Sequence, residues 1–224
     1  MVVKPFSDPE VEITGDGYAT LYRRDIDEHY HSTKGAVAES AHVYVNTGWL
    51  PVAKAATGIV RVFEVGFGTG LNAALTAEAA LRLKVPTEYH AVELHPLSQD
   101  IVARLGYGEA SRFFADVNAA SWDARAEINR YFTLVKANDD FLTMNLPSDL
   151  NVVYFDAFAP EKQPEMWSDE LFERLYGAMS HGGVLTTYCA KGEVRRRLVG
   201  VGFEVERLPG PPNGKREIIR ATKR

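Results

Sequence analysis

The feature that most constrains this chain is an apolar run that breaks into three closely spaced glycines. Val60-Arg-Val-Phe-Glu-Val65 predicts a strand, Gly66-Phe-Gly-Thr-Gly70 a turn, and the residues from Leu71 onward a helix. At the edge of a parallel sheet, such a turn lets a nucleotide-like ligand lie against bare backbone, because glycine has no Cβ to block the approach. The candidate cofactor-binding residues of this segment are Glu64, Gly66, Phe67, Gly68, Gly70 and Asn72.

The spacing of the glycines distinguishes two kinds of ligand. They follow Gly-x-Gly-x-Gly, and Leu71 stands where a dinucleotide-binding Gly-x-Gly-x-x-Gly has its third glycine. A second strand ends at Glu93, roughly twenty residues farther on, where an acid takes the hydroxyls of a ribose. A glycine triplet alone also occurs in structural turns. Together with Glu93, it favours S-adenosylmethionine over NAD as the cofactor.

Strands and helices alternate from residue 60 onward, which predicts parallel strands with right-handed crossovers. We expect strands at 60–64, 88–93, 132–136, 152–156 and 184–189, and helices at 73–83, 96–105, 168–179 and 194–199. The last two strands, 203–208 and 216–221, are joined by a short Pro/Gly link with no room for a helix, so they are predicted to be antiparallel. The expected fold class is α/β, of the class I methyltransferase type: a Rossmann-like, mostly parallel seven-stranded sheet with a C-terminal antiparallel hairpin.

The length of 224 residues suits one sizeable α/β domain with an N-terminal extension. We predict a β-hairpin at 11–22 followed by a partly helical segment, with residues 1–50 forming a substrate-side extension and residues 51–224 the methyltransferase domain. The single cysteine, Cys189, excludes an internal disulfide and a multi-cysteine metal site, and no metal is expected. No stretch reaches the length of a membrane span, and the segment Met1–Asp8 lacks the apolar core of a signal peptide, so a cytoplasmic location is expected.

Two further acids follow predicted strands and fall at the same edge of the sheet. Asp139 either accepts a hydrogen bond from an adenine amino group or caps a short helix, two interpretations of equal weight. Asp156 ends the most apolar strand beside the glycine turn, so its side chain is predicted to project into the ligand crevice. It is the candidate catalytic residue. Asp156 could hold the amino group of the cofactor's methionine part or orient an acceptor amine.

The charge pattern bears on the substrate. A net charge of −5 and a pI near 5.7 argue against a broad nucleic-acid-binding coat, because phosphate binding needs clustered Lys and Arg. The C-terminal part nevertheless concentrates basic residues. A solvated helix face and a charged tail explain this concentration about as well as a local phosphate-binding patch does. Any single aromatic residue is more often part of the core than a stacking platform for a base. The candidate substrate-binding residues are Tyr30, Glu39, Trp167, Tyr188, Arg195, Arg196, Lys215 and Arg216.

Several segments together resemble one family over nearly the whole chain. Gly66-Phe-Gly-Thr-Gly-Leu-Asn72, Asp156-Ala-Phe-Ala-Pro160 with Gln163-Pro-Glu-Met-Trp167, Val194-Arg-Arg196 with Gly202-Phe203, and Gly214-Lys-Arg-Glu217 look like the methyltransferase half of the bifunctional tRNA-modifying enzyme MnmC. The lead-in Asp27-Glu-His-Tyr-His-Ser32, with Gly35, Glu39-Ser40 and Val43-Tyr-Val45, is similar as well. Departures are Gln163, where the family often has Asn, and Cys189, in place of a hydroxyl residue.

The resemblance implies methyl transfer from S-adenosylmethionine to the aminomethyl nitrogen of a tRNA wobble uridine, which gives 5-methylaminomethyl-2-thiouridine. It also implies a stand-alone methyltransferase working with a separate FAD-dependent oxidase, since the chain stops at Arg224. A methyltransferase or aminopropyltransferase acting on a small amine is the nearest alternative, although the basic C-terminal part does not suit a cationic substrate. A non-catalytic S-adenosylmethionine-binding module would not need Asp156, and an NAD-dependent oxidoreductase does not fit the glycine spacing.

Overall fold

The structure, a computed structural model, describes residues 9–224 and contains two sheets. The small sheet holds β1 (Glu10–Ile13), β2 (Ala19–Arg23) and β3 (Glu28–His29). The strands of the large sheet are β4 (Val60–Val65), β5 (Thr87–Val92), β6 (Arg125–Asn129), β7 (Phe132–Ala137), β8 (Leu150–Phe155), β9 (Met179–Thr187), β10 (Phe203–Pro209) and β11 (Glu217–Lys223). The large sheet has the order β10-β11-β9-β8-β4-β5-β7-β6.

The strand directions of the large sheet confirm the predicted fold class. β9, β8, β4, β5 and β7 are parallel to one another, and β11 lies antiparallel between β9 and β10. The predicted count of seven strands was wrong by one. The eighth strand, β6, pairs antiparallel with β7 at the edge of the sheet and carries a register shift between Glu127 and Asn129. A short, bulged edge strand buries little apolar surface, so its sequence alternates too weakly to be recognised.

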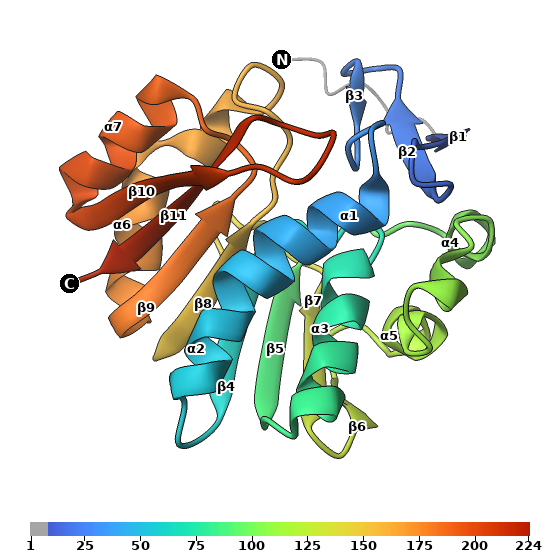
Figure 1. Ribbon diagram of the computed structural model, residues 1–224, viewed down its shortest axis with the longest axis horizontal. Coiled ribbons are helices and arrows are strands. Elements are labelled where there is room, and N and C mark those ends of the chain that lie inside the picture. Colours follow the sequence, from blue (N-terminus) through green and yellow to red (C-terminus); the bar gives the residue numbers. More distant parts are fainter. Residues whose placement is uncertain (1–8) are drawn as a thin grey trace.

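Helices cover both faces of the large sheet (Figure 1). They are α1 (Ala36–Ser40), α2 (Leu50–Ala55), α3 (Leu71–Leu83), α4 (Gln99–Ala103), α5 (Phe114–Ala119), α6 (Asp169–Ala178) and α7 (Gly192–Val201), with a π-helical stretch at Ala41–Trp49 and 3-10 turns at Tyr107–Glu109 and Pro164–Trp167. α4 is shorter than the predicted 96–105, because Ser98 caps its start and Arg104 ends it. The 3-10 turn at Tyr107–Glu109 and α5 were not predicted.

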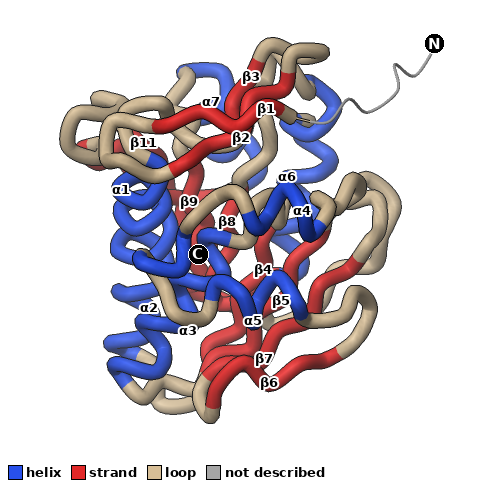
Figure 2. The backbone as a smooth tube through the Cα atoms, turned by 90° about the vertical axis from the view of Figure 1, so that its right-hand side faces the viewer, coloured by secondary structure: helices blue, strands red, loops and turns tan. Residues whose placement is uncertain are grey.

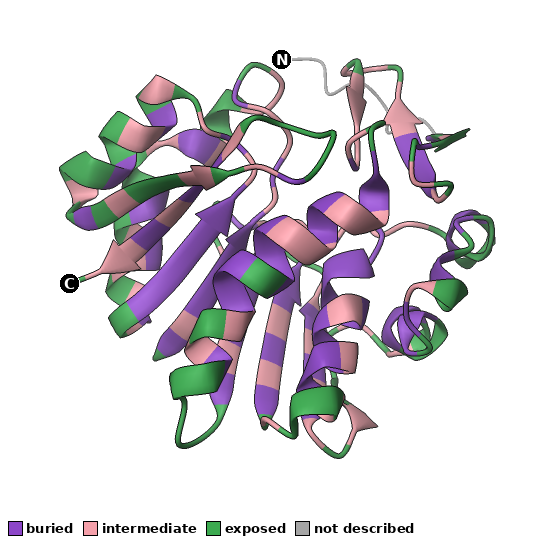
Figure 3. Ribbon diagram, in the orientation of Figure 1, coloured by how far each residue is buried: buried purple, intermediate pink, exposed green. Residues whose placement is uncertain are grey.

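Alternating side chains of the central strands build two apolar clusters, one on each face of the sheet. Val152 and Tyr154 of β8 join the cluster that includes the π-helical stretch and α3, whereas Val153 and Phe155 join the cluster that includes α6 and α7. All four residues are fully buried. Figure 3 shows the resulting band of buried residues along the central strands.

α1, the π-helical stretch and α2 form one uninterrupted helical run, Ala36–Ala55, across one face of the sheet (Figure 1). Gly48 allows the close approach, since a Cβ there would lie 2.9 Å from Thr186 Oγ1 and 3.1 Å from Tyr154 Cε1. The run passes through residue 50 without a break. The division into residues 1–50 and 51–224 stays a prediction.

The predicted hairpin is confirmed as the antiparallel pair β1 and β2. Together with β3, it lies beyond the carboxyl ends of the parallel strands, in Figure 1 and in the rotated view of Figure 2. The prediction made for Met1–Asp8 falls outside the described residues. Between residues 9 and 224, no helix is both long and apolar enough to cross a membrane.

Candidate active site

A cavity of about 340 Å³ lies at the carboxyl ends of β4, β5, β7 and β8. The glycine loop forms its floor, and residues from β3 and the loop after it close the opposite side. A crevice at this edge is where open α/β sheets bind their ligands. The predicted site residues that line the cavity are Tyr30, Glu39, Gly66, Phe67, Gly68, Asn72, Glu93, Asp139, Asp156, Tyr188 and Lys215.

The glycine loop is held in a conformation that other residues rarely adopt. Gly66, Gly68 and Gly70 have φ angles of 86°, 52° and 78°, in the left-handed region that favours glycine. The loop is anchored to β5, because the amides of Gly66 and Phe67 both donate to the carbonyl of Val92, at 3.2 and 3.0 Å. Gly70 does not line the cavity. Because Gly70 has no Cβ, the Phe67 ring can lie close to it. A Cβ at residue 70 would lie 2.8 Å from Phe67 Cζ.

Glu93 lies at the end of β5 and contacts the glycine loop directly. Its carboxylate accepts hydrogen bonds from the amides of Gly68 (3.0 Å) and His95 (2.9 Å). Burial raises the pKa of Glu93, and these two backbone hydrogen bonds oppose the rise. Because a carboxylate has about four lone-pair sites, Glu93 can accept further donors from the cavity.

The two acids after β7 have different surroundings. Asp140 accepts from the amide of Leu142 at 2.9 Å through its side chain, and its carbonyl accepts from Thr143 and Met144, so it caps the following turn. Both acids line the cavity, and Asp139 accepts from the amide of Asp140 at 2.7 Å. The neighbouring residue therefore supplies the capping role that was considered for Asp139. Contact of Asp139 with an adenine stays a prediction.

Asp156 is the centre of a buried hydrogen-bond network that spans three elements. The hydroxyl of Tyr44 donates to Asp156 Oδ1, and the side-chain amide of Asn72 donates to Asp156 Oδ2 at 2.8 Å. Asn72 also donates to Glu64 Oε1 at 2.9 Å, so it links the two acids. Burial raises the pKa of Asp156 to about 7, and the hydrogen bonds from Tyr44 and Asn72 limit the rise.

Glu64 belongs to this network but lies beneath the cavity rather than in its lining. Its side chain is fully buried, and burial raises its pKa well above the ordinary value. Glu64 accepts the hydrogen bond of Asn72 away from the cavity, while Asp156 is the acid of this network that lines the cavity.

Sequence analysis missed two residues of the site, Tyr44 and His31. Tyr44 is separated from Asp156 by 112 positions, and no spacing rule connects them. His31 lines the cavity, and its Nε2 lies 2.7 Å from Thr69 Oγ1 in the glycine loop. Burial lowers the pKa of His31 to about 4, so the imidazole is neutral at pH 7. Both residues fall within the segments that carried the family resemblance, which is the one signal that could have identified them.

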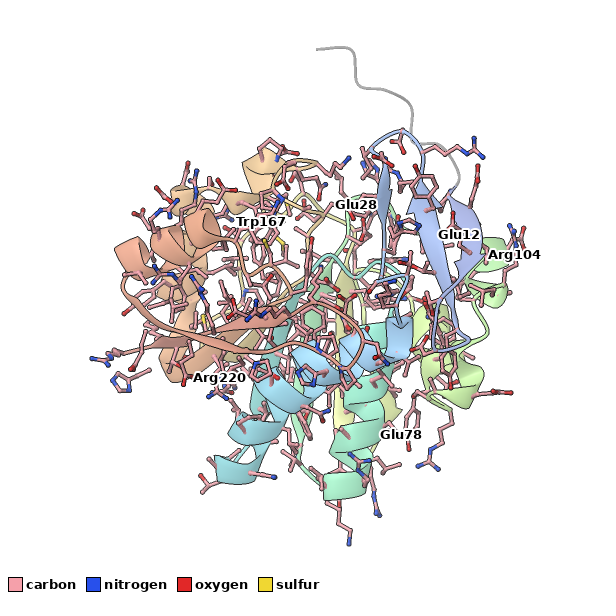
Figure 4. All side chains as sticks on the ribbon, turned by 45° about the horizontal axis from the view of Figure 1, so that its top comes forward. Glu12, Glu28, Glu78, Arg104, Trp167 and Arg220 are labelled. Carbon is pink, nitrogen blue, oxygen red and sulfur yellow. The ribbon has the colours of Figure 1, made fainter. Side chains whose placement is uncertain are left out.

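Trp167, one of the candidate substrate-binding residues, does not line the cavity. It is 2% exposed, its Nε1 donates to the carbonyl of Phe158 at 2.8 Å, and its ring packs against Phe155 at 4.8 Å. Figure 4 shows Trp167 in the C-terminal half of the molecule, whereas Glu28, which lines the cavity, stands on β3. The ring of Trp167 is thus packed within the core, and neither of its faces is open for stacking with a base.

The basic candidate substrate-binding residues also differ in whether they line the cavity. Lys215 lines the cavity, but Arg195, Arg196 and Arg216 do not. Arg196 and Arg216 are exposed, and Arg195 is partly buried on α7. These three arginines stay candidates for contacts outside the cavity.

An open, mostly parallel sheet with a glycine loop and acids at the carboxyl ends of its strands defines an enzyme of the class I methyltransferase type. The chain belongs to the S-adenosyl-L-methionine-dependent methyltransferase family, whose sequence model matches residues 93–224. Its cofactor is S-adenosylmethionine, as predicted.

Longer proteins of known name are similar to almost the whole chain. The tRNA 5-methylaminomethyl-2-thiouridine biosynthesis bifunctional protein MnmC of Cupriavidus necator is 33% identical over 217 residues, which cover 91% of this chain and 32% of that protein. The protein of the same name from Cupriavidus metallidurans is 32% identical over 228 residues, which cover 93% of this chain and 33% of that protein. The chain therefore spans about a third of the length of these relatives.

Solved structures support the fold. The crystal structure of MNMC2 from Aquifex aeolicus superposes with a TM-score of 0.80 at 23% identity, over 99% of this chain and 72% of that chain. Spermidine synthase from Thermotoga maritima superposes with a TM-score of 0.55 at 13% identity, over 100% of this chain and 83% of that chain. At these identities, the comparisons establish the fold alone.

The residues of the cavity fit S-adenosylmethionine. A Cβ at Gly66 would lie 3.0 Å from the carbonyl oxygen of Asp156, so the glycine keeps the loop close to β8. Glu93 offers acceptors for ribose hydroxyls, Asp139 for an adenine amino group, and Asp156 for an amine. These assignments of individual residues to parts of the cofactor are predictions.

Proposed function

We propose that this methyltransferase acts on the primary amine of an aminomethyl group at the wobble uridine of tRNA. The observation that carries the proposal is Asp156, a buried acid in the cavity beside the glycine loop with a pKa of about 7. The similarity to proteins named for tRNA 5-methylaminomethyl-2-thiouridine biosynthesis supports the tRNA substrate. Work on tRNA also agrees with a cytoplasmic location.

The chemistry requires a neutral acceptor. S-adenosylmethionine supplies an activated sulfonium methyl group, so the protein's main tasks are to align the amine and to exclude water. An alkylamine with a pKa of about 10 is mostly protonated at neutral pH and cannot attack until it loses a proton. A nearby base must therefore accept that proton.

Asp156 suits this task. A carboxylate with a pKa near 7 is ionised in about half of the molecules at neutral pH, and it is a stronger base than an exposed aspartate. Tyr44 and Asn72 hold the two oxygens of Asp156 in fixed directions. In this mechanism, Asp156 accepts the proton of the ammonium group, while Tyr44 and Asn72 stabilise the carboxylate before the transfer.

The partner proteins belong to the same proposal. The relatives are named as bifunctional proteins, and the chain spans about a third of their length. The proposed partner is an FAD-dependent oxidase, which would prepare the aminomethyl group of the substrate.

Mass spectrometry of tRNA nucleosides tests the proposal. The protein is incubated with S-adenosylmethionine and with tRNA whose wobble uridine carries the aminomethyl group. We expect one added methyl group on that nucleoside, little product with Asp156→Ala, and a smaller loss with Asp139→Ala, which acts through cofactor affinity. In parallel reactions, a free polyamine replaces tRNA. Its methylation by S-adenosylmethionine, or its aminopropylation by added decarboxylated S-adenosylmethionine, with no product on tRNA, would show that the substrate is a small amine.

A further inference from the structure

Lys215 places its ammonium group inside the mouth of the cavity. Its Nζ lies 3.5 Å from the centre of the Tyr188 ring, and 3.8 Å from Glu39 Oε1. Lys215 comes from the link between β10 and β11, whereas Glu39 belongs to α1 and Tyr188 follows β9. A primary alkylammonium therefore already lies between an aromatic face and a carboxylate, which is a favourable arrangement for such a cation.

Glu39 is the fixed part of this arrangement. The side chain is 9% exposed, and its Oε2 accepts from the amide of Ser32 at 2.8 Å. Its Oε1 is buried and has no hydrogen-bond donor among residues 9–224. The distance of 3.8 Å to Lys215 is too long for a hydrogen bond. Because an unsatisfied buried carboxylate oxygen is costly, this oxygen favours a closer ammonium donor.

We propose that Glu39 and Tyr188 form the subsite for the primary ammonium group of the acceptor, and that Lys215 occupies this subsite until the acceptor displaces it. The inference rests on the proposed function, in which the acceptor is a primary amine. Lys215 Nζ stands in for the aminomethyl group: both are ammonium groups on an unbranched carbon, with three donors to offer.

The displacement of Lys215 by the acceptor exchanges one ammonium group for another. Glu39 is buried and cannot move to water, but the side chain of Lys215 is 44% exposed and can swing outward. Replacing one ammonium by another leaves the charge of the pocket unchanged, so the buried carboxylate keeps a counter-ion during the exchange. Asp156 lines the same cavity, where it can accept the proton of the arriving ammonium. Lys215 then acts as an internal competitor rather than as a contact to tRNA phosphates.

A titration with ethylammonium chloride tests the subsite without tRNA. Amide NMR shifts are followed in the protein bound to S-adenosylhomocysteine, with sodium chloride keeping the ionic strength constant. Lys215→Met should bind ethylammonium about fivefold more tightly than the unaltered protein, because the resident cation is gone. Glu39→Gln should lose the binding, and Lys54→Met, which removes an exposed lysine from α2, should behave like the unaltered protein.

Two results would overturn the inference: unchanged or weaker ethylammonium binding in Lys215→Met, or unchanged binding in Glu39→Gln. Retained affinity for S-adenosylhomocysteine shows that each variant is folded. If Glu39→Gln fails this control, Tyr188→Leu serves in its place, because it removes the aromatic face and should also lose the binding.

Kinetics on aminomethyl-uridine tRNA separate this inference from the proposed function. Lys215→Met should lower the KM for tRNA, whereas a lysine that contacts phosphate would raise the KM when removed. Absence of any product on tRNA would refute the proposed function. The ethylammonium titration would still decide whether the cavity holds an ammonium subsite.

Discussion

Asp156 shows how one residue can be tuned by its neighbours. Burial and the nearby charge of Glu39 favour the protonated carboxyl, while the hydroxyl of Tyr44, the amide of Asn72 and the charge of Lys215 favour the carboxylate. The balance gives a pKa of about 7, where the group can both accept and release a proton. In the proposed mechanism, Tyr44 therefore helps to set the pH range in which the enzyme works.

Tyr44→Phe tests this balance. Removing the hydroxyl removes a hydrogen bond that lowers the pKa of Asp156, so the pKa should rise above about 7. The acidic limb of the pH profile of kcat/KM should then shift to higher pH, by up to about one unit. Asp139→Asn, which changes a residue outside the hydrogen-bond network of Asp156, should leave the acidic limb of the profile at its original pH. An unshifted profile in Tyr44→Phe would mean that Asp156 is not the titrating base.

Asp156→Asn should stabilise the protein at alkaline pH. The folded-state pKa of about 7 lies above the ordinary 3.8, so the folded protein binds this proton more tightly than the unfolded chain does. Stability therefore falls as the pH rises from about 4 through 7, and the full cost is present above pH 7. Urea unfolding at pH 8 should show the variant more stable by roughly 1–4 kcal/mol, and the gain should shrink at pH 5. An equal difference at both pH values would contradict the shifted pKa.

Some residues of the site could be predicted from the sequence, and others could not. Gly66, Glu93 and Asp156 follow strands at fixed chain distances, so parallel-sheet geometry predicts that they meet. Tyr44 lies in a helical run with no such rule, and its contact with Asp156 depends on how that run packs. Tyr188 lies in a predicted strand and Trp167 directly before a predicted helix, yet only Tyr188 lines the cavity. Sequence alone does not distinguish a core aromatic from one at a surface.

At the scale of elements, local signals at helix ends were informative. Ser168 was expected to begin the helix that precedes β9, and its Oγ accepts from the amide of Leu171 at 3.3 Å at the start of α6. The helical run Ala36–Ala55 was only partly expected, because residues on both of its sides are buried and no simple amphipathic stripe results. Elements with caps and one apolar face can be predicted, and those shaped by tertiary packing cannot.

Ser168→Ala should lower the stability of the protein by about 1 kcal/mol, the usual cost of losing an N-cap hydrogen bond. Urea unfolding measures this change, and binding of S-adenosylhomocysteine should stay the same because α6 does not line the cavity. Ser168→Asp, which keeps a capping acceptor, is the matched control and should retain the stability. A loss of equal size in both variants would show that the hydroxyl contributes by another route.

At the scale of the whole molecule, the proposed function requires an acidic protein to bind a polyanion. The net charge of −5 repels tRNA at long range, so binding depends on where the basic residues lie. Arg196 on α7 and Arg216 before β11 are exposed and lie outside the cavity. We propose that they contact phosphates of tRNA whose wobble base enters the cavity.

Replacing Arg196 and Arg216 by Gln should raise the KM for tRNA and flatten its dependence on salt. The slope of the logarithm of affinity against the logarithm of salt concentration should fall by about 0.7–0.9 for each lost phosphate contact. Affinity for S-adenosylhomocysteine should stay the same. Arg104→Gln, at the end of α4 (Figure 4), is the matched control and should leave the salt dependence unaltered. An unchanged slope in the double variant would place the tRNA on another face.

The π-helical stretch Ala41–Trp49 makes the site sensitive to the number of residues as well as to their kinds. A π-helical turn amounts to one residue added to an α-helix, and such turns are frequent at functional sites. Because the added residue is absorbed within the stretch, the helices before and after it keep the phase of an uninterrupted α-helix. A one-residue deletion inside the stretch therefore relaxes it to α geometry and leaves α1 and α2 in phase. The same deletion in α2 has no added residue to remove, so it would turn everything before it by about 100° and carry Tyr44 away from Asp156.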